Sequence, residues 1–212
     1  MNAQELLSVT WRELAQRHGC TAPQAQTVLD ELVAAYLAPG RQYHTLEHIA
    51  ALLRQLDEHG HAVVDRDALI LAIIFHDVVY DPLRQDNEDQ SAALAQARLT
   101  SLQFADALVQ KVGHYIQATR HGHDLDIGDA DLALLLDLDL STLAAAPHEY
   151  RLYTKAIRRE YGHVPDALYR LGRRQVLAGF LGRSRIYRTD HLHARWEERA
   201  RANISGEIAE LS

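Results

Sequence analysis

The sequence has 212 residues, of which 47% are hydrophobic and 24% are charged, and its formal net charge is −7. This length fits one large domain or two small ones, and the acidic balance gives no indication of a protein that binds a nucleic-acid backbone. The single cysteine, Cys20, excludes an intramolecular disulfide framework, and the N-terminal segment predicts neither a signal peptide nor a membrane span, so we expect a cytoplasmic protein.

Apolar residues recur three or four positions apart through most of the chain, which is the periodicity of amphipathic helices. It predicts ten helices, at residues 3–18, 23–38, 45–59, 66–80, 88–101, 104–119, 131–144, 147–161, 166–181 and 190–209. Pro39-Gly40 and Pro147 mark two of the boundaries. Because there is no repeat and no strong linker, we expect an all-α, single-domain helical bundle over residues 1–212.

The segment 66–80 is apolar on most faces and predicts a central buried helix, since its alanine and leucine content argues against a strand over 69–75. His76 and Asp77 follow its apolar run. Neighbouring side chains on a helix point about 100° apart, so both can flank one point, as metal ligands do. Imidazole and carboxylate together suit a divalent transition metal. By itself, the pair also fits a helix-terminal histidine beside a surface aspartate.

Further ligands can come from two other predicted helices. His44 and His48 are four positions apart and share one helical face if both are helical. His48 lies on the apolar stripe of its helix, where a core histidine is an alternative to a ligand. Asp137 and Asp139 lie in the apolar segment 131–144, but they point about 200° apart and cannot easily share one site. Either aspartate can instead be a helix-terminal residue.

In chain order, His48, His76-Asp77 and Asp139 form the pattern H…HD…D, which resembles the HD superfamily of metal-dependent phosphohydrolases. The segments that carry the resemblance lie within residues 41–181 and read RQYHTLEHI, LAIIFHDVVYD, DNEDQSA, DLDLSTL, AIRREY and GRRQVL. They are most similar to a bacterial branch described as predicted phosphohydrolases. The resemblance implies an HD-like helical bundle with a metal held by His48, His76, Asp77 and Asp139. Asp137 remains an alternative for the last ligand.

The resemblance also implies a reaction, the hydrolysis of a small phosphorylated molecule such as a nucleotide by metal-activated water. The expected cofactor is one divalent transition metal per chain, with Mn, Co, Ni, Fe and Zn as candidates and Mg as a further one. Glu88 and Asp81, shortly after the HD pair, are candidates for acid/base catalysis. Candidate substrate-binding residues share cationic or polar side chains in the loops near these motifs: Arg41, His44, Arg84, Asn87 and His121.

Two other functions remain open at this point. A second metal bound by His114 and His121 would favour a di-iron oxygenase of the HD type. A non-catalytic module that binds a nucleotide or a protein partner is the other alternative. We expect a small-molecule substrate rather than a nucleic-acid polymer or a membrane. The polar helix 190–209 carries Trp196, Ile204 and Ile208, which can pack on the core or on a second copy of the chain in a homodimer.

Overall fold

The structure is a computed structural model that describes residues 1–120 and 128–212. Over these residues it contains ten α-helices, one 3-10 helix and no strand, so the predicted all-α fold and the number of helices are confirmed. The elements are α1 (Ala3–Arg17), α2 (Ala22–Tyr36), α3 (Leu46–His59), α4 (Arg66–Phe75), α5 (Asn87–Ser101), α6 (Asp106–Ala118), α7 (Ala130–Asp139), η1 (Leu140–Ala144), α8 (Pro147–Glu160), α9 (Asp166–Leu181) and α10 (Asp190–Glu210). None of these helices is both long enough and apolar enough to cross a bilayer.

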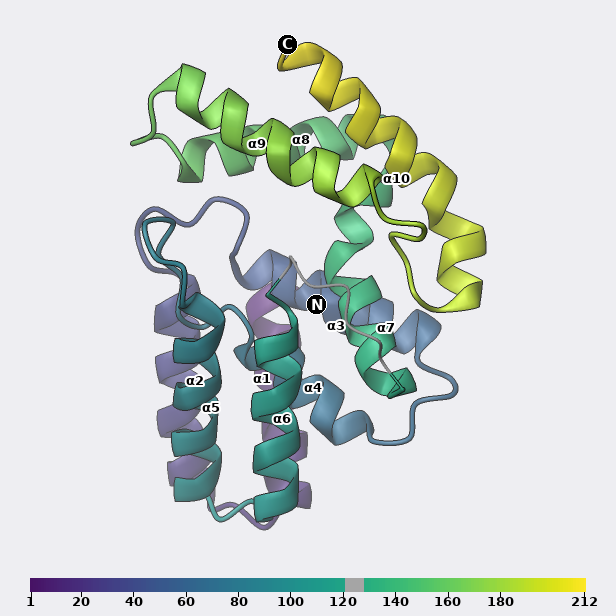
Figure 1. The fold of residues 1–212 in the computed structure, drawn as a ribbon. Helices are drawn as coiled ribbons and strands as arrows, with labels where there is room; N and C mark the ends of the chain where they lie inside the picture. The colour runs from purple at the N-terminus through teal and green to yellow at the C-terminus, as the bar shows by residue number, and fades with distance from the viewer. Residues whose placement is uncertain (121–127) are drawn as a thin grey trace. The chain divides into compact units, whose positions relative to one another are not determined.

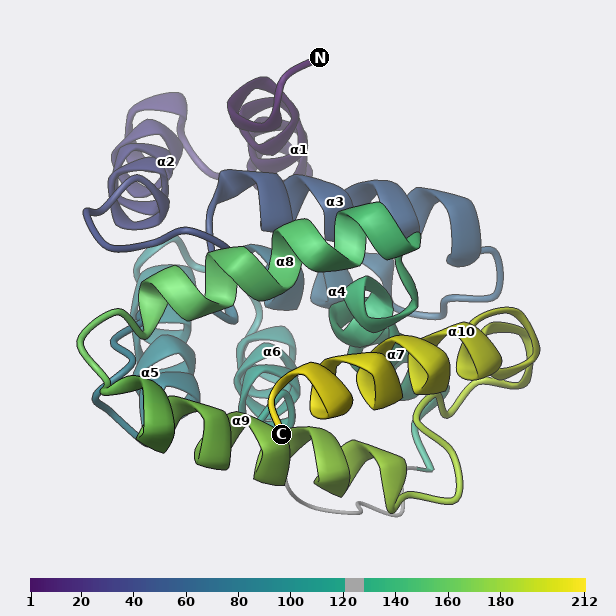
Figure 2. The same ribbon diagram turned by 90° about the horizontal axis from the view of Figure 1, so that it is seen from above.

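The chain divides into two compact units, Met1–His123 and Asp124–Ser212. In the first unit, α1, α2, α5 and α6 run roughly parallel to one another, while α3 runs across them (Figures 1 and 2). The packed pairs of helices include α1 with α2, α5 with α6, and α4 with α3, α5 and α6. That both units form a single domain stays a prediction.

Helix α4 is the buried centre of the first unit. Every residue from Ala68 to Phe75 has at most 7% of its surface exposed, so the predicted central helix is confirmed. An element that is apolar on all faces is stable only when other elements cover it, and α3, α5 and α6 pack against it. The surroundings of its C-terminal end are therefore rigidly defined by the core.

The end of α4 differs from the prediction, which extended the helix to residue 80. The helix ends at Phe75, and His76 caps it with helical backbone angles. The chain then turns, with the Val78 amide donating to the Phe75 carbonyl, while the Tyr36 hydroxyl donates to the Ile74 carbonyl. A local amide and a hydroxyl from another helix thus satisfy two carbonyls at the helix end, and the residues after His76 form a turn. The HD pair thus lies at the helix end rather than within the helix.

In the second unit, η1 continues α7 and packs against α8 and α10, and α9 packs against α10. Trp196 and Ile204 of α10 are buried within this unit. A buried ion pair joins α9 to α10, with Arg173 Nε 2.8 Å from Glu207 Oε1, and the Tyr150 hydroxyl of α8 donates to the same carboxylate. Polar contacts as well as apolar packing therefore hold the three terminal helices together.

Candidate metal centre

Three ligand-type atoms converge in the first unit: His48 Nε2, His76 Nε2 and Asp77 Oδ2. The two imidazole nitrogens are 3.3 Å apart, and Asp77 Oδ2 is 3.0 Å from His76 Nε2 and 3.7 Å from His48 Nε2. Both histidines are buried, and 18% of the Asp77 side chain is exposed. The grouping could hold a metal ion, and it is the one cluster of three or more His, Cys, Asp or Glu of this kind within residues 1–120 and 128–212.

Packing explains why these side chains meet although they are far apart in sequence. His48 lies in the first turn of α3, among the buried residues Leu46, Ile49 and Leu52. His76 lies at the C-terminal end of α4, which packs against α3. The buried face of α3 therefore brings His48 to the end of α4. His48 is thus a core histidine by burial and a candidate ligand by position.

A local hydrogen bond orients the His76 ring. His76 Nδ1 is 2.9 Å from the carbonyl oxygen of Ile73, one turn earlier in α4. A carbonyl only accepts, so Nδ1 carries the proton in this bond, and in the neutral ring Nε2 is left with a lone pair. That lone pair faces Asp77 Oδ2, which is also an acceptor when ionised. The pair therefore requires a positive charge, either a second proton on His76 or a bound cation.

The charge of Asp77 is favoured by its neighbours. Burial raises the pKa of this carboxyl group, but the positive charges of protonated His76 and His44, the hydrogen bond from His76 and the charge of His48 together hold the pKa well below its ordinary value. Asp77 therefore stays ionised at neutral pH. An ionised carboxylate beside two imidazoles is a donor set that divalent transition metals accept.

The distances between the three atoms also fit one ion. Ligands about 2.1 Å from a metal lie about 3.0 Å apart when their bonds are at right angles. The separations of 3.0 and 3.3 Å match this geometry, and 3.7 Å corresponds to a wider angle. Three protein ligands leave positions open for water and substrate. The three separations are thus compatible with one divalent metal ion.

His44 lies beside the cluster but differs from the prediction in one respect. Helix α3 begins at Leu46, so His44 precedes it and does not share a helical face with His48. Its ring stacks on Tyr80 at 4.1 Å between centroids and lies 6.0 Å from the His48 ring. His44 therefore reaches the edge of the cluster through the loop that leads into α3.

Arg41 contacts the backbone of the HD segment. Its Nη1 donates to the carbonyls of His44 and Asp77, at 2.9 and 2.8 Å, and its Nη2 donates to the carbonyl of Val78 at 2.8 Å. These contacts favour a supporting role for the guanidinium over the predicted contact with substrate.

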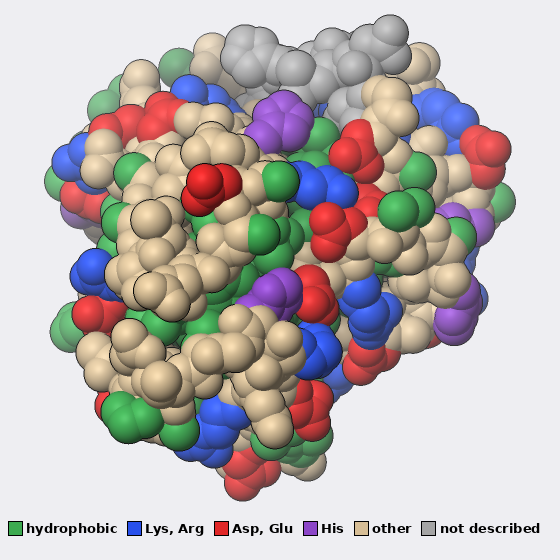
Figure 3. All heavy atoms as spheres, turned by 90° about the horizontal axis from the view of Figure 1, so that it is seen from below, with side chains coloured by type: hydrophobic (Ala, Val, Ile, Leu, Met, Phe, Trp, Pro, Cys, Tyr) green, Lys and Arg blue, Asp and Glu red, His purple; other side chains and the backbone are tan. Residues whose placement is uncertain are grey.

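The loop after the HD pair is held by its own side chains. The Asn87 amide accepts from the Asp81 backbone amide and donates to the Asp81 carbonyl, at 3.1 and 2.9 Å. The Asp81 carboxylate accepts from the Leu83 amide. Arg84 forms a two-pronged ion pair with Asp86 at the surface. On the face drawn in Figure 3, acidic and basic side chains are interspersed in this way. These contacts fold the loop and leave the predicted substrate roles of Arg84 and Asn87 untested.

Glu88 lies in the first turn of α5, where the helix dipole stabilises a negatively charged carboxylate. Arg120, shortly after α6, forms ion pairs with two residues of this turn. Its Nη2 atom lies 2.5 Å from Asp89 Oδ2, and its Nε atom lies 3.5 Å from Glu88 Oε2. The closer partner of Arg120 is therefore Asp89. Glu88 retains its predicted candidacy for proton transfer.

The predicted downstream aspartates belong to the second unit, and their surroundings separate them. Asp137 is buried and accepts three hydrogen bonds: from the Arg188 amide at 2.7 Å, the Thr189 amide at 2.8 Å and the Thr189 hydroxyl at 2.6 Å. It thereby holds the two residues that precede α10, and burial raises its pKa. Asp139 is the last residue of α7. Its assignment as a metal ligand stays a prediction.

The residues predicted for a second metal are only partly described. His121 lies outside the described residues. His114 is an exposed residue of α6, and its ring neighbours Tyr115 at 6.3 Å. It does not belong to the His48–His76–Asp77 cluster.

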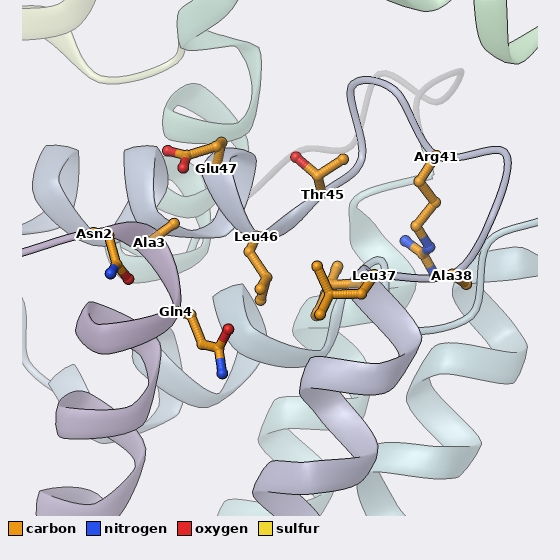
Figure 4. Close-up of a pocket in the computed structure, with 10 residues that line it drawn as sticks. Asn2, Ala3, Gln4, Leu37, Ala38, Arg41, Thr45, Leu46 and Glu47 are labelled. Carbon is orange, nitrogen blue, oxygen red and sulfur yellow. The ribbon is translucent and has the colours of Figure 1, made fainter.

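A pocket of about 410 Å³ also lies in the first unit (Figure 4). It is lined by Asn2, Ala3, Gln4, Tyr36, Leu37, Ala38, Arg41, Thr45, Leu46 and Glu47. Figure 4 shows Arg41 at one end of the pocket and Asn2 and Gln4 of α1 at the other. None of the three convergent residues lines it. Two residues of the pocket lining, Arg41 and Tyr36, also contact the backbone at the end of α4.

Comparisons with known proteins add no relative. No protein-family model matches the chain, and searches of curated proteins and of solved structures find no match either. The HD superfamily therefore remains a resemblance in sequence pattern, and the arguments about function rest on the geometry of the cluster.

Proposed function

We propose that the chain is a metal-dependent phosphohydrolase that acts on a small phosphorylated molecule, with a nucleotide as one candidate. The observation that carries the proposal is the convergence of His48 Nε2, His76 Nε2 and Asp77 Oδ2 at separations of 3.0 to 3.7 Å. Buried charged and polar atoms are costly unless they are paired, and a cation among these three would pair them all.

His48, His76 and Asp77 would hold the ion, and the single negative charge of Asp77 would leave a divalent metal with a net positive charge. Such a metal supplies a Lewis acid and lowers the pKa of a water molecule that it holds. Asp139 is kept as the predicted fourth ligand. The three hydrogen bonds accepted by Asp137 support the choice of Asp139 over Asp137, because they occupy most of the lone pairs that the Asp137 carboxylate could offer a metal.

The remaining polar residues divide into supporting and reactive candidates. Glu88 is the preferred candidate for proton transfer, since its contact with Arg120 is long, at 3.5 Å, whereas the carboxylate of Asp81 accepts from a backbone amide of its own turn at 2.9 Å. The guanidinium groups of Arg41 and Arg84 are engaged with carbonyls and with Asp86, respectively. The attraction of an anionic substrate would therefore depend on the positive charge of the centre and on His44 at its edge.

The first test measures metal binding and hydrolysis together. Purified chain would be loaded with Mn²⁺, Co²⁺ or Ni²⁺, its metal content determined by elemental analysis, and its activity measured on a panel of phosphate monoesters and nucleotides. We expect about one metal per chain and hydrolysis of at least one class of ester. His76→Ala and Asp77→Ala should lose both, with helical content by circular dichroism largely retained. Unchanged metal content in both variants would refute the assignment.

The alternatives appear as distinct outcomes of the same experiment. Two irons per chain would favour the di-iron oxygenase. Metal binding without hydrolysis of any ester, combined with measurable affinity for a nucleotide, would favour a non-catalytic module. A double variant of two histidines outside the cluster, His148→Ala with His163→Ala, provides a matched control for the loss of imidazole groups as such.

A further inference from the structure

We propose that Arg41 is a positioning residue of the metal centre, which sets the distance between His48 and the His76–Asp77 pair. The inference rests on the proposed function, because it concerns the same three ligands. It assigns Arg41 a task other than contact with the substrate.

The first observation is that Arg41 spans both segments that carry the ligands. It donates to the carbonyl of His44, in the loop that leads into α3 and His48. It also donates to the carbonyls of Asp77 and Val78, at the end of α4. One guanidinium group thus joins the entry to α3 with the turn that holds Asp77, and the two segments cannot separate without breaking these bonds.

The second observation is that aromatic rings hold the guanidinium in place. The Cζ atom of Arg41 lies 5.1 Å from the centre of the Tyr36 ring and 5.5 Å from that of Tyr80. Tyr80 in turn stacks on His44. Cation–π contacts of this kind favour a planar, weakly hydrated cation. Lysine could keep the charge at this position but could not reach three carbonyls with a rigid fork.

Tyr36 supports the same turn independently. Its hydroxyl donates to the carbonyl of Ile74 at 2.8 Å, and its side chain is fully buried. Burial, followed by the negative charge of Asp77, raises its pKa well above the ordinary value, so the hydroxyl keeps its proton and remains a donor. Arg41 and Tyr36 together therefore account for three carbonyls at and just after the end of α4, those of Ile74, Asp77 and Val78.

The test compares Co²⁺ binding by the whole chain in three forms: wild type, Arg41→Lys and Tyr36→Phe. Affinity would be measured by titration calorimetry, and the geometry of the site by the visible absorption of bound Co²⁺. Loss of a group that orients metal ligands typically lowers metal affinity by about 10- to 100-fold. We expect Arg41→Lys to fall in this range with an altered Co²⁺ spectrum, and Tyr36→Phe to show a smaller loss.

A matched control is Arg98→Lys. Arg98 belongs to the same unit and pairs with Glu31 at the surface. The Arg98→Lys variant should therefore bind Co²⁺ as the wild type does. Wild-type affinity and an unchanged spectrum in Arg41→Lys would overturn the inference while leaving the metal centre intact. Absence of Co²⁺ binding by the wild type would overturn the proposed function and this inference together. Circular dichroism and thermal melting of the metal-free variants show whether a loss of affinity reflects unfolding. If Arg41→Lys is unfolded, Tyr36→Phe decides: a loss of Co²⁺ affinity supports the inference, and wild-type affinity overturns it.

Discussion

Asp77 in the first unit and Asp137 in the second are both carboxylates attached to strongly apolar helical segments, but their partners differ in kind. Asp137 accepts from two backbone amides and a hydroxyl, so neutral donors satisfy it. Asp77 Oδ2 instead faces two imidazole nitrogens, one of which is an acceptor in the neutral ring. The first arrangement is complete within the protein, whereas the second requires a proton or a cation.

This difference separates a structural carboxylate from a candidate ligand more clearly than burial does. Both residues are largely shielded, and both would be anomalous in an apolar segment without partners. Asp77 and Asp137 differ in whether the atoms around the carboxylate are hydrogen-bond donors or acceptors. Asp137, in α7, accepts hydrogen bonds from the residues before α10. Asp77 lies beside imidazole nitrogens that can also act as acceptors.

The largest difference in metal affinity is expected when each aspartate is replaced by asparagine, which removes the negative charge. Asp77→Asn should lower Co²⁺ affinity at least about 100-fold, since it removes a charged ligand rather than a supporting group. Asp137→Asn should leave Co²⁺ affinity within about twofold of the wild type, because the Asp137 carboxylate is already satisfied by donors of Arg188 and Thr189. Calorimetric titration of both variants measures the contrast. Equal losses would abolish the distinction drawn here between the two carboxylates.

The next effect concerns the stability of the second unit. Asp137→Ala removes the acceptor of three part-buried hydrogen bonds from Arg188 and Thr189, and it should cost about 1–3 kcal/mol of unfolding free energy. Urea unfolding, followed by circular dichroism, measures this loss. Ser205→Ala, an exposed position of α10, serves as the control and should be nearly neutral. An unchanged urea midpoint in Asp137→Ala would mean that its hydrogen bonds contribute nothing to the fold.

A third prediction compares Asp139 with Asp137 as the fourth metal ligand. The sequence pattern predicts that Asp139→Asn weakens metal binding, whereas Asp137→Asn does not. The expected loss is about tenfold or more, because the variant removes a charged ligand while His48, His76 and Asp77 remain. Titration of both variants with Mn²⁺ decides between them. A larger loss in Asp137→Asn would reverse the assignment.

A smaller effect is expected in the loop after the HD pair. Asn87→Ala removes two hydrogen bonds to the Asp81 backbone and should cost roughly 1–2 kcal/mol, since one such bond contributes about 1 kcal/mol. Hydrogen exchange of the amides in residues 79–87 should accelerate. Unaltered exchange would show that the loop is held by other contacts.

The smallest effect is expected at Arg84. Its ion pair with Asp86 is exposed, so Arg84→Ala should leave the thermal midpoint unchanged. KM for a hydrolysed ester should also remain close to that of the wild type, because the guanidinium is already engaged. A large increase in KM, at constant kcat, would instead restore the predicted contact between Arg84 and phosphate.

Much of the local structure could be predicted because helix formation depends on neighbouring residues. The predicted helix starts and ends agree with the structure to within two residues for nearly every element, as in α3 and α8. Two ends differ more: α4 was predicted to end at residue 80 and ends at Phe75, and α7 was predicted to end at residue 144 and ends at Asp139, where the 3-10 helix η1 follows. At the end of α4, donors from Tyr36 and Arg41 satisfy carbonyls of residues 74 to 78, and no periodicity in the segment itself indicates these donors.

The sequence by itself determined the all-α class and the buried helix before His76, since these follow from periodicity. It made His48, His76 and Asp77 candidates through their residue types and through the resemblance to the HD pattern. Only the tertiary structure decided which of the polar residues meet. His48 lies 28 positions from His76, Arg41 lies 36 from Asp77, and Asp137 lies 51 from Arg188. Contacts over such separations depend on how helices pack, and packing depends on the whole chain rather than on any one segment.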